Sequence, residues 1–230
     1  MLNFDSPTYP YDRVAAGYLR FKGAEKIPYQ LLMYLLDLPD QNGYQPVDDN
    51  SRPRVRLAKY LWYDGANPLS QTLPTAVEKR SMLFDGNNPV IDTDQQKALH
   101  PHGYRLYMQQ FWEQAQKVAQ TTLKCYIGRV IPTNSFSASI GIVFEILVNY
   151  GQETTTKTDA YAKAYNIEQC LLESLHGVNI AGVGVVDFSR YAHGDNGSRA
   201  IYDEGRNVGR RIYMSIQWAE SEQDPISGDC

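Results

Sequence analysis

The chain has 230 residues, of which 43% are hydrophobic, so it can bury a core as one large domain or as one domain with an extension. A formal net charge of -4 disfavours a dedicated nucleic-acid-binding protein, which usually presents a basic face. Three scattered cysteines exclude a disulfide framework, and no apolar run is long enough to cross a bilayer. The N-terminus lacks the basic and apolar regions of a signal peptide, so synthesis in a reducing cytoplasm is expected.

Residues 1–102 are predicted to form an N-terminal arm followed by an irregular extension of short helices and loops. The arm, residues 1–20, is rich in Tyr and Pro. Two short helices are predicted, one over residues 27–38 with a proline in its first turn, and one over residues 54–63. Asn-Pro and Asp-Gly pairs between residues 64 and 89 predict a dense series of turns.

Residues 103–220 are predicted to form a compact domain that begins with a helix and two strands. The helix covers Tyr104–Leu123, because apolar residues recur there at steps of three and four. Strands are predicted over Lys124–Ile131 and Ser139–Tyr150. The second strand alternates apolar residues, which assigns one face of it to the core: Ile140, Ile142, Phe144, Ile146 and Val148.

The domain is predicted to continue with a second helix and two more strands. The helix starts from a cap at Thr158 or Asp159 and ends at Leu175, with Gly177 as the glycine that terminates it. The remaining segments are a strand over Val178–Phe188, a long exposed loop over 189–207, a strand over Arg210–Trp218 and an acidic flexible tail over 221–230. The predicted fold class is therefore α+β, with a four-stranded, mostly antiparallel sheet and helices packed on one face.

Two carboxylates raise an alternative. Glu145 and Asp187 are predicted on neighbouring strands, where a pair of carboxylates can hold Mg²⁺ for nuclease chemistry. However, Glu145 is followed by two apolar residues and not by the Glu-x-Lys pattern of restriction-type nucleases. His100 and His102 flank a proline, which favours a turn over a metal site. We therefore predict no catalytic residues, no metal and no cofactor, and keep a metal-dependent nuclease or other enzyme that uses Glu145 and Asp187 as the alternative.

The second half also resembles a known class of proteins. The run Phe144–Tyr150 is followed by a polar loop, by the helical segment Ile167–Gly177 and by Val178–Gly184. This succession resembles neck and tail-terminator proteins of tailed bacteriophages over roughly residues 103–218. The small terminators lack the N-terminal hundred residues found here.

The resemblance implies a virion structural protein at the head–tail junction or tail end. It implies a ring, usually of six copies, that contacts other neck, connector or tail proteins, with DNA only passing through the lumen and no membrane. Catalytic residues are not implied. Tyr and Arg are favoured in interface anchors, and long loops are usually functional or disordered. The predicted subunit-interface residues in the arm and the long loop are therefore Tyr9, Tyr11, Tyr191, Arg199, Tyr202 and Arg206.

Overall fold

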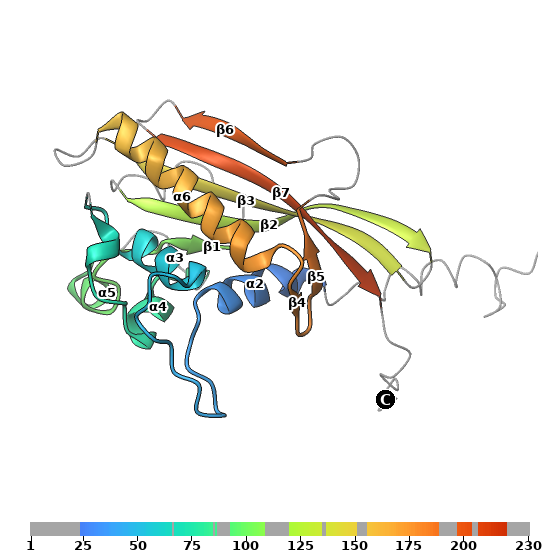
Figure 1. Cartoon of the computed structure of the whole chain (residues 1–230), viewed down its shortest axis with the longest axis horizontal. Helices are drawn as coiled ribbons and strands as arrows, with labels where there is room; N and C mark the ends of the chain where they lie inside the picture. Colours follow the sequence, from blue (N-terminus) through green and yellow to red (C-terminus); the bar gives the residue numbers. More distant parts are fainter. Residues whose placement is uncertain are drawn as a thin grey trace, which may run out of the picture.

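The computed structural model describes residues 24–65, 67–84, 86, 93–108, 120–134, 137–150, 156–188, 197–203 and 207–219. Within these residues a curled, mixed sheet of seven strands is covered on one face by helices (Figure 1). The helices are η1 Ala24–Lys26, α2 Ile27–Leu35, α3 Pro53–Trp62, η2 Pro68–Ser70, α4 Ala76–Ser81, α5 Asp94–Leu99 and α6 Lys157–Leu175. The strands are β1 Leu106–Tyr107, β2 Thr121–Asn134, β3 Ser137–Asn149, β4 Asn179–Ile180, β5 Gly184–Asp187, β6 Gly197–Asp203 and β7 Asn207–Ala219.

The predicted α+β class is confirmed, but the predicted number of four strands is wrong. The strand order is β1-β2-β3-β7-β5-β4, and β6 also pairs with β7. β1 is parallel to β2, whereas the other pairs are antiparallel. β7 therefore has β3 along one side, while its other side is shared by β6 near its beginning and β5 near its end.

The long strands β2, β3 and β7 form the centre of the sheet. On β3 the predicted core residues are all buried, and Phe144 lies between Cys125 of β2 and Ile212 of β7. The same buried cluster contains apolar residues of α2, α3 and α6, such as Leu31, Leu61 and Ile167. α6 packs on β3 and β7, while α2 and α3 pack on β2. The alternation along β3 therefore predicted correctly which face the helices cover.

The predicted helix over Tyr104–Leu123 is wrong at both ends. Leu106 and Tyr107 form β1, and Thr121 begins β2. β-branched threonines at 121 and 122 favour a strand over a helix. The backbone of Leu123 is tied to this region by a hydrogen bond from its N–H to the carbonyl of Arg105 (2.8 Å). Residues 109–119, the middle of the predicted helix, lie outside the described residues.

The predicted strand over Val178–Phe188 is in fact a short hairpin, β4–β5. Residues 181–183 form a turn, and Gly182 and Gly184 have φ angles of 76° and 95°. Glycine adopts this left-handed backbone without steric cost, so the two glycines reverse the chain where one straight strand was predicted. Val183, in the turn itself, is buried in the core.

The predicted loop over 189–207 contains a strand. Residues 197–203 form β6, which pairs with β7 from Gly197 opposite Tyr213 to Asp203 opposite Asn207. β7 therefore begins at Asn207, earlier than predicted. Residues 189–196 and 204–206 lie outside the described residues. The polar composition of the segment hid this strand, because an edge strand needs few apolar residues.

The cap of the long helix α6 is Thr156, two residues before the earlier of its predicted caps. The Thr156 hydroxyl accepts a hydrogen bond from the N–H of Asp159 (3.2 Å), and the Asp159 carboxylate accepts one from the N–H of Thr156 (3.3 Å). This reciprocal capping box satisfies helix N–H groups that have no partner within the helix. Gly177 has a φ of 74° just after the helix, as predicted. Of the described helices, none is both long and apolar enough to span a membrane.

A close approach between β3 and β7 makes one glycine sensitive to substitution. A Cβ on Gly209 would lie 1.9 Å from the carbonyl oxygen of Ile146. We expect Gly209→Ala to lower the free energy of unfolding by about 1–3 kcal/mol, because the strands must separate to admit the methyl group. Gly65→Ala is the matched control, since a Cβ there meets nothing within 4 Å. Equal urea midpoints for the two variants would contradict this prediction.

Candidate functional site

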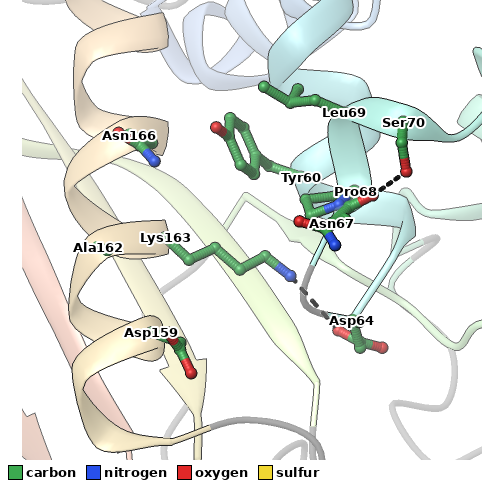
Figure 2. Close-up of a pocket in the computed structure, with 11 residues that line it drawn as sticks. Tyr60, Asp64, Asn67, Pro68, Leu69, Ser70, Asp159, Ala162, Lys163 and Asn166 are labelled. Atoms are coloured by element: carbon green, nitrogen blue, oxygen red, sulfur yellow. Dashed lines mark hydrogen bonds and ion pairs between the residues drawn. The ribbon is translucent and has the colours of Figure 1, made fainter.

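A cavity of about 340 Å³ lies between α3, η2 and the first half of α6 (Figure 2). The loop after α3 contributes Asp64 and Asn67, and α3 itself contributes Tyr60. From the opposite wall, α6 contributes Lys163 and Asn166. Figure 2 shows the Lys163 side chain running from α6 across the cavity toward Asp64.

Asp64 is the centre of a network that joins four parts of the chain. Arg105, just before β1, donates from Nη1 to Oδ1 (2.7 Å) and from Nη2 to Oδ2 (2.6 Å). The N–H of Thr121, the first residue of β2, also donates to Oδ1 (3.2 Å). Burial raises the pKa of Asp64, but the hydrogen bonds and charge of Arg105, with help from Lys163 and Thr121, hold the pKa below its usual value. Asp64 is therefore an ionised carboxylate, and both of its oxygens accept hydrogen bonds from Arg105.

Lys163 is a buried cation in the wall of the cavity, with its side chain 9% exposed. Its Nζ donates to the carbonyl oxygen of Tyr63 (2.7 Å) and lies 3.9 Å from Oδ1 of Asp64. Burial lowers the pKa of Lys163 to about 8; Asp64 opposes this shift and Arg105 adds to it. At neutral pH the amine is thus still charged, but it is held in a place that disfavours its charge.

The rest of the lining combines apolar and amide groups. Tyr60 is buried, and burial raises the pKa of its hydroxyl. Pro68 and Leu69 of η2 supply apolar surface, while Ser70 donates a hydrogen bond to the carbonyl of Asn67 (2.8 Å). Chemically, the cavity can hold a small group that presents both a charge and an apolar body.

This site is not evident from the local sequence patterns, although one signal of it is present. Lys163 lies among Ala160, Ala164 and Ile167 on the apolar face of α6, where a charged residue is unusual. Glu168 on the same helix is also buried and accepts a hydrogen bond from Nε of Arg210 (2.5 Å). A buried charge on an apolar helix face therefore marks a tertiary ion pair, but the sequence does not show the partner.

Two of the predicted interface residues lie on β6. Tyr202 is 67% exposed, and its ring contacts the ring of Tyr161 on α6, with centroids 5.8 Å apart. The guanidinium of Arg199 lies over the ring of Tyr213 on β7 at 5.5 Å. The other predicted residues lie outside the described residues: Tyr9, Tyr11, Tyr191 and Arg206.

The structure does not bring Glu145 and Asp187 together. Glu145 lies opposite Arg211 on β7, and Asp187 lies opposite Ser215, which is four residues, or roughly 13 Å, further along that strand. Glu145 forms an ion pair with Arg211 and accepts a hydrogen bond from the hydroxyl of Tyr126 (2.7 Å). Asp187 lies 3.7 Å from Nδ1 of His176. This geometry gives no support to a two-carboxylate magnesium site.

The two histidines of the predicted turn, His100 and His102, contact different residues. Nδ1 of His100 is 2.7 Å from the carbonyl oxygen of Ser81, and the ring of His102 stacks on Trp62 with centroids 3.9 Å apart. Among the described residues, His, Cys, Asp and Glu side chains do not gather in groups of three or more that can hold a metal ion. Cys125 and Cys170 are buried, and neither forms a disulfide.

Comparison with known proteins identifies a family for the chain. No curated protein matches the chain. The sequence model of the YomW family matches residues 55–216, which run from the first turn of α3 to Ile216 in β7. This family is named for a protein of the Bacillus phage SPbeta region. Because the match covers more than half of the chain, the protein belongs to the YomW family and is phage-associated.

Proposed function

We propose that the chain is a structural protein of a phage particle, without catalytic activity, that assembles with copies of itself into a ring at the head–tail junction or tail end. The membership of a phage-associated family supports the phage part of this proposal. The resemblance of residues 103–218 to neck and tail-terminator proteins supports the position and the ring. Six copies are the expected number, with other neck, connector or tail proteins above and below.

The observation that carries the proposal is an open strand edge. Among the described residues, β6 pairs with β7 alone, so its outer side presents unpaired backbone N–H and C=O groups. Such an edge is a template for pairing with another chain unless it is covered or blunted. β6 carries no proline, and its residues 197–202 are partly or fully exposed. A second copy of the chain is the partner that we propose for this edge.

A second open edge lies on the opposite side of the sheet (Figure 1). β1 pairs with β2 only at Leu123 and Lys124. Beyond this point the outer side of β2 has no strand partner within the described residues, and Val130 there is 41% exposed. If the β6 edge of one copy contacts the β2 edge of the next, the copies are joined head to tail. Such an arrangement forms a ring when the rotation between neighbouring copies brings the last copy back to the first.

Aromatic side chains surround the β6 edge. Tyr202 on β6 and Tyr165 on α6 are exposed, at 67% and 53%, and Tyr161 contacts Tyr202. Arg210 lies over the ring of Tyr165 at 6.0 Å. Tyrosine and arginine are enriched in interfaces because they combine apolar area with polar tips. This composition favours a protein partner for the edge.

The proposal is tested by sedimentation velocity of the full-length protein over a range of concentrations. We expect the wild type to sediment as an oligomer. Tyr202→Asp is expected to weaken association at least roughly tenfold, because it places a charge in an apolar contact. Val77→Asp on α4, which replaces another exposed apolar residue (78%), is the control and should assemble like the wild type. A wild type that is a single chain at every concentration would refute the ring, whereas full assembly of Tyr202→Asp would exclude only β6 as the contact.

A further inference from the structure

We propose that the cavity between α3 and α6 binds an organic monocarboxylate, with Lys163 as the residue that contacts the carboxylate group. This site is separate from the β6 edge, and the inference does not depend on ring formation. It follows from the charges and hydrogen bonds around Lys163, from the lining of the cavity, and from the groups that exclude other ligands.

The charges of the ionic network beside the cavity do not balance. Arg105, Asp64 and Lys163 carry two positive charges and one negative charge, and the Arg105 and Lys163 side chains are only 3% and 9% exposed. Arg105 occupies both oxygens of Asp64 at 2.6–2.7 Å, while Lys163 stays at 3.9 Å from it. The negative charge of Asp64 is therefore paired mainly with Arg105. A monoanion beside Lys163 would balance the charges of these three side chains, whereas Asp159, which also lines the cavity, is exposed to solvent.

The ammonium group of Lys163 also has unused hydrogen-bonding capacity. It carries three N–H donors. Among the described residues, the carbonyl of Tyr63 is its hydrogen-bond acceptor. A buried charge is costly unless it is both paired and hydrogen-bonded, so an oxygen ligand placed in the cavity would be stabilised there. Because Lys163 lines the cavity, a ligand that enters it can reach the amine.

The remaining walls indicate what the rest of the ligand is like. Tyr60, Pro68, Leu69 and Ala162 supply apolar surface, which suits a hydrocarbon body attached to the carboxylate. A volume of about 340 Å³ is at the lower end of the range for small-molecule sites. An aromatic or short aliphatic acid matches both the size and the lining.

Other charged groups exclude a more highly charged anion. Asp159 also lines the cavity, and its carboxylate is held at the start of α6 by Thr156. Together with Asp64 it would repel the second charge of a phosphate. Asp159 is not the partner of Lys163, because among the described residues the ion pair of Lys163 is with Asp64 and the Asp159 carboxylate binds Thr156. The site therefore fits one negative charge and not two.

The test uses benzoate as the probe and benzamide, its neutral analogue of the same shape, as the control ligand. Binding to the full-length protein is measured by isothermal titration calorimetry at pH 7. We expect benzoate to bind at least roughly tenfold more tightly than benzamide, as a charge-assisted bond implies. Lys163→Met is expected to remove this preference, and it should fold because Asp64 keeps its two bonds to Arg105. Lys97→Met on α5, where the lysine is exposed, should bind like the wild type.

A pH series on the wild type gives a second measurement that does not depend on the folding of a variant. Between pH 7 and pH 9 Lys163 loses most of its charge, since burial lowers its pKa to about 8. Benzoate binding should therefore weaken roughly tenfold over this interval, while benzamide binding stays constant. The charged groups around Lys163 are Asp64, Arg105 and Asp159. The pKa of Asp64 is lowered, that of Tyr60 is raised and that of the nearby His102 is lowered, so each of these three shifts leads away from the interval between pH 7 and pH 9. Equal affinity for benzoate and benzamide, or unchanged benzoate binding by Lys163→Met, would overturn the proposal.

Discussion

Replacing Phe144 by alanine is expected to lower the free energy of unfolding by about 3–5 kcal/mol. Phe144 is fully buried in the middle of β3, between Cys125 of β2 and Ile212 of β7 and beneath the helices. Removing the ring leaves a cavity at the point where the strands and helices meet, and close-packed surroundings relax only partly. The measurement is urea denaturation followed by circular dichroism.

A matched control for Phe144 is available on the same sheet. Val185 on β5 is 49% exposed, so Val185→Ala should change the free energy of unfolding by no more than about 0.5 kcal/mol. An unchanged midpoint for Phe144→Ala, or equal effects of the two substitutions, would show that β3 is not the centre of the core.

Asp64→Asn is expected to cost a similar amount, about 3–5 kcal/mol. The substitution keeps the shape of the side chain but removes its charge. Arg105 and Lys163 would then be two largely buried cations with no carboxylate between them. Asp94→Asn on α5 is the control, because that side chain is fully exposed and its loss should have little effect. A melting curve of Asp64→Asn that matches the control would contradict the importance of the network.

The same carboxylate predicts a pH dependence with a definite sign. Arg105, with Lys163 and Thr121, holds the pKa of Asp64 in the folded protein below its value in the unfolded chain, which is roughly 4. The stabilisation from Asp64 is therefore fully present above about pH 4 and is lost as the pH falls through the folded-state pKa. The stability difference between the wild type and Asp64→Asn should shrink below that pH. A constant difference between pH 7 and pH 3 would contradict the prediction.

Local patterns predicted the elements that depend on one buried face. The alternation of Ile140, Ile142 and Phe144 located β3 and its core side, because a strand with one buried face repeats every two residues. The apolar spacing and the terminal glycine located α6 in the same way. The prediction failed where structure is set by partners distant in the sequence. β6 depends on pairing with β7, and β1 depends on pairing with β2.

The cavity could not have been predicted from the sequence for the same reason. Its ion network joins Asp64, Arg105 and Lys163, which come from three separate parts of the chain. No local spacing connects these residues, and although Lys163 stands out on the apolar face of α6, the sequence does not identify its partners. The carboxylates that did look related in the sequence, Glu145 and Asp187, face different partners on the sheet. The predicted strands therefore located the core-facing side of the sheet, but they did not show which polar side chains contact one another.

Direct imaging of the purified full-length protein is the measurement that tests the central claim most directly. Negative-stain electron microscopy, at a concentration where sedimentation detects the oligomer, should show closed rings with a central opening and with six copies as the expected number. Such rings should be lost in Tyr202→Asp and kept in Val77→Asp. Particles of single-chain size under all conditions, in wild type and variants alike, would contradict the account of this YomW-family protein as a ring-forming component of a phage particle.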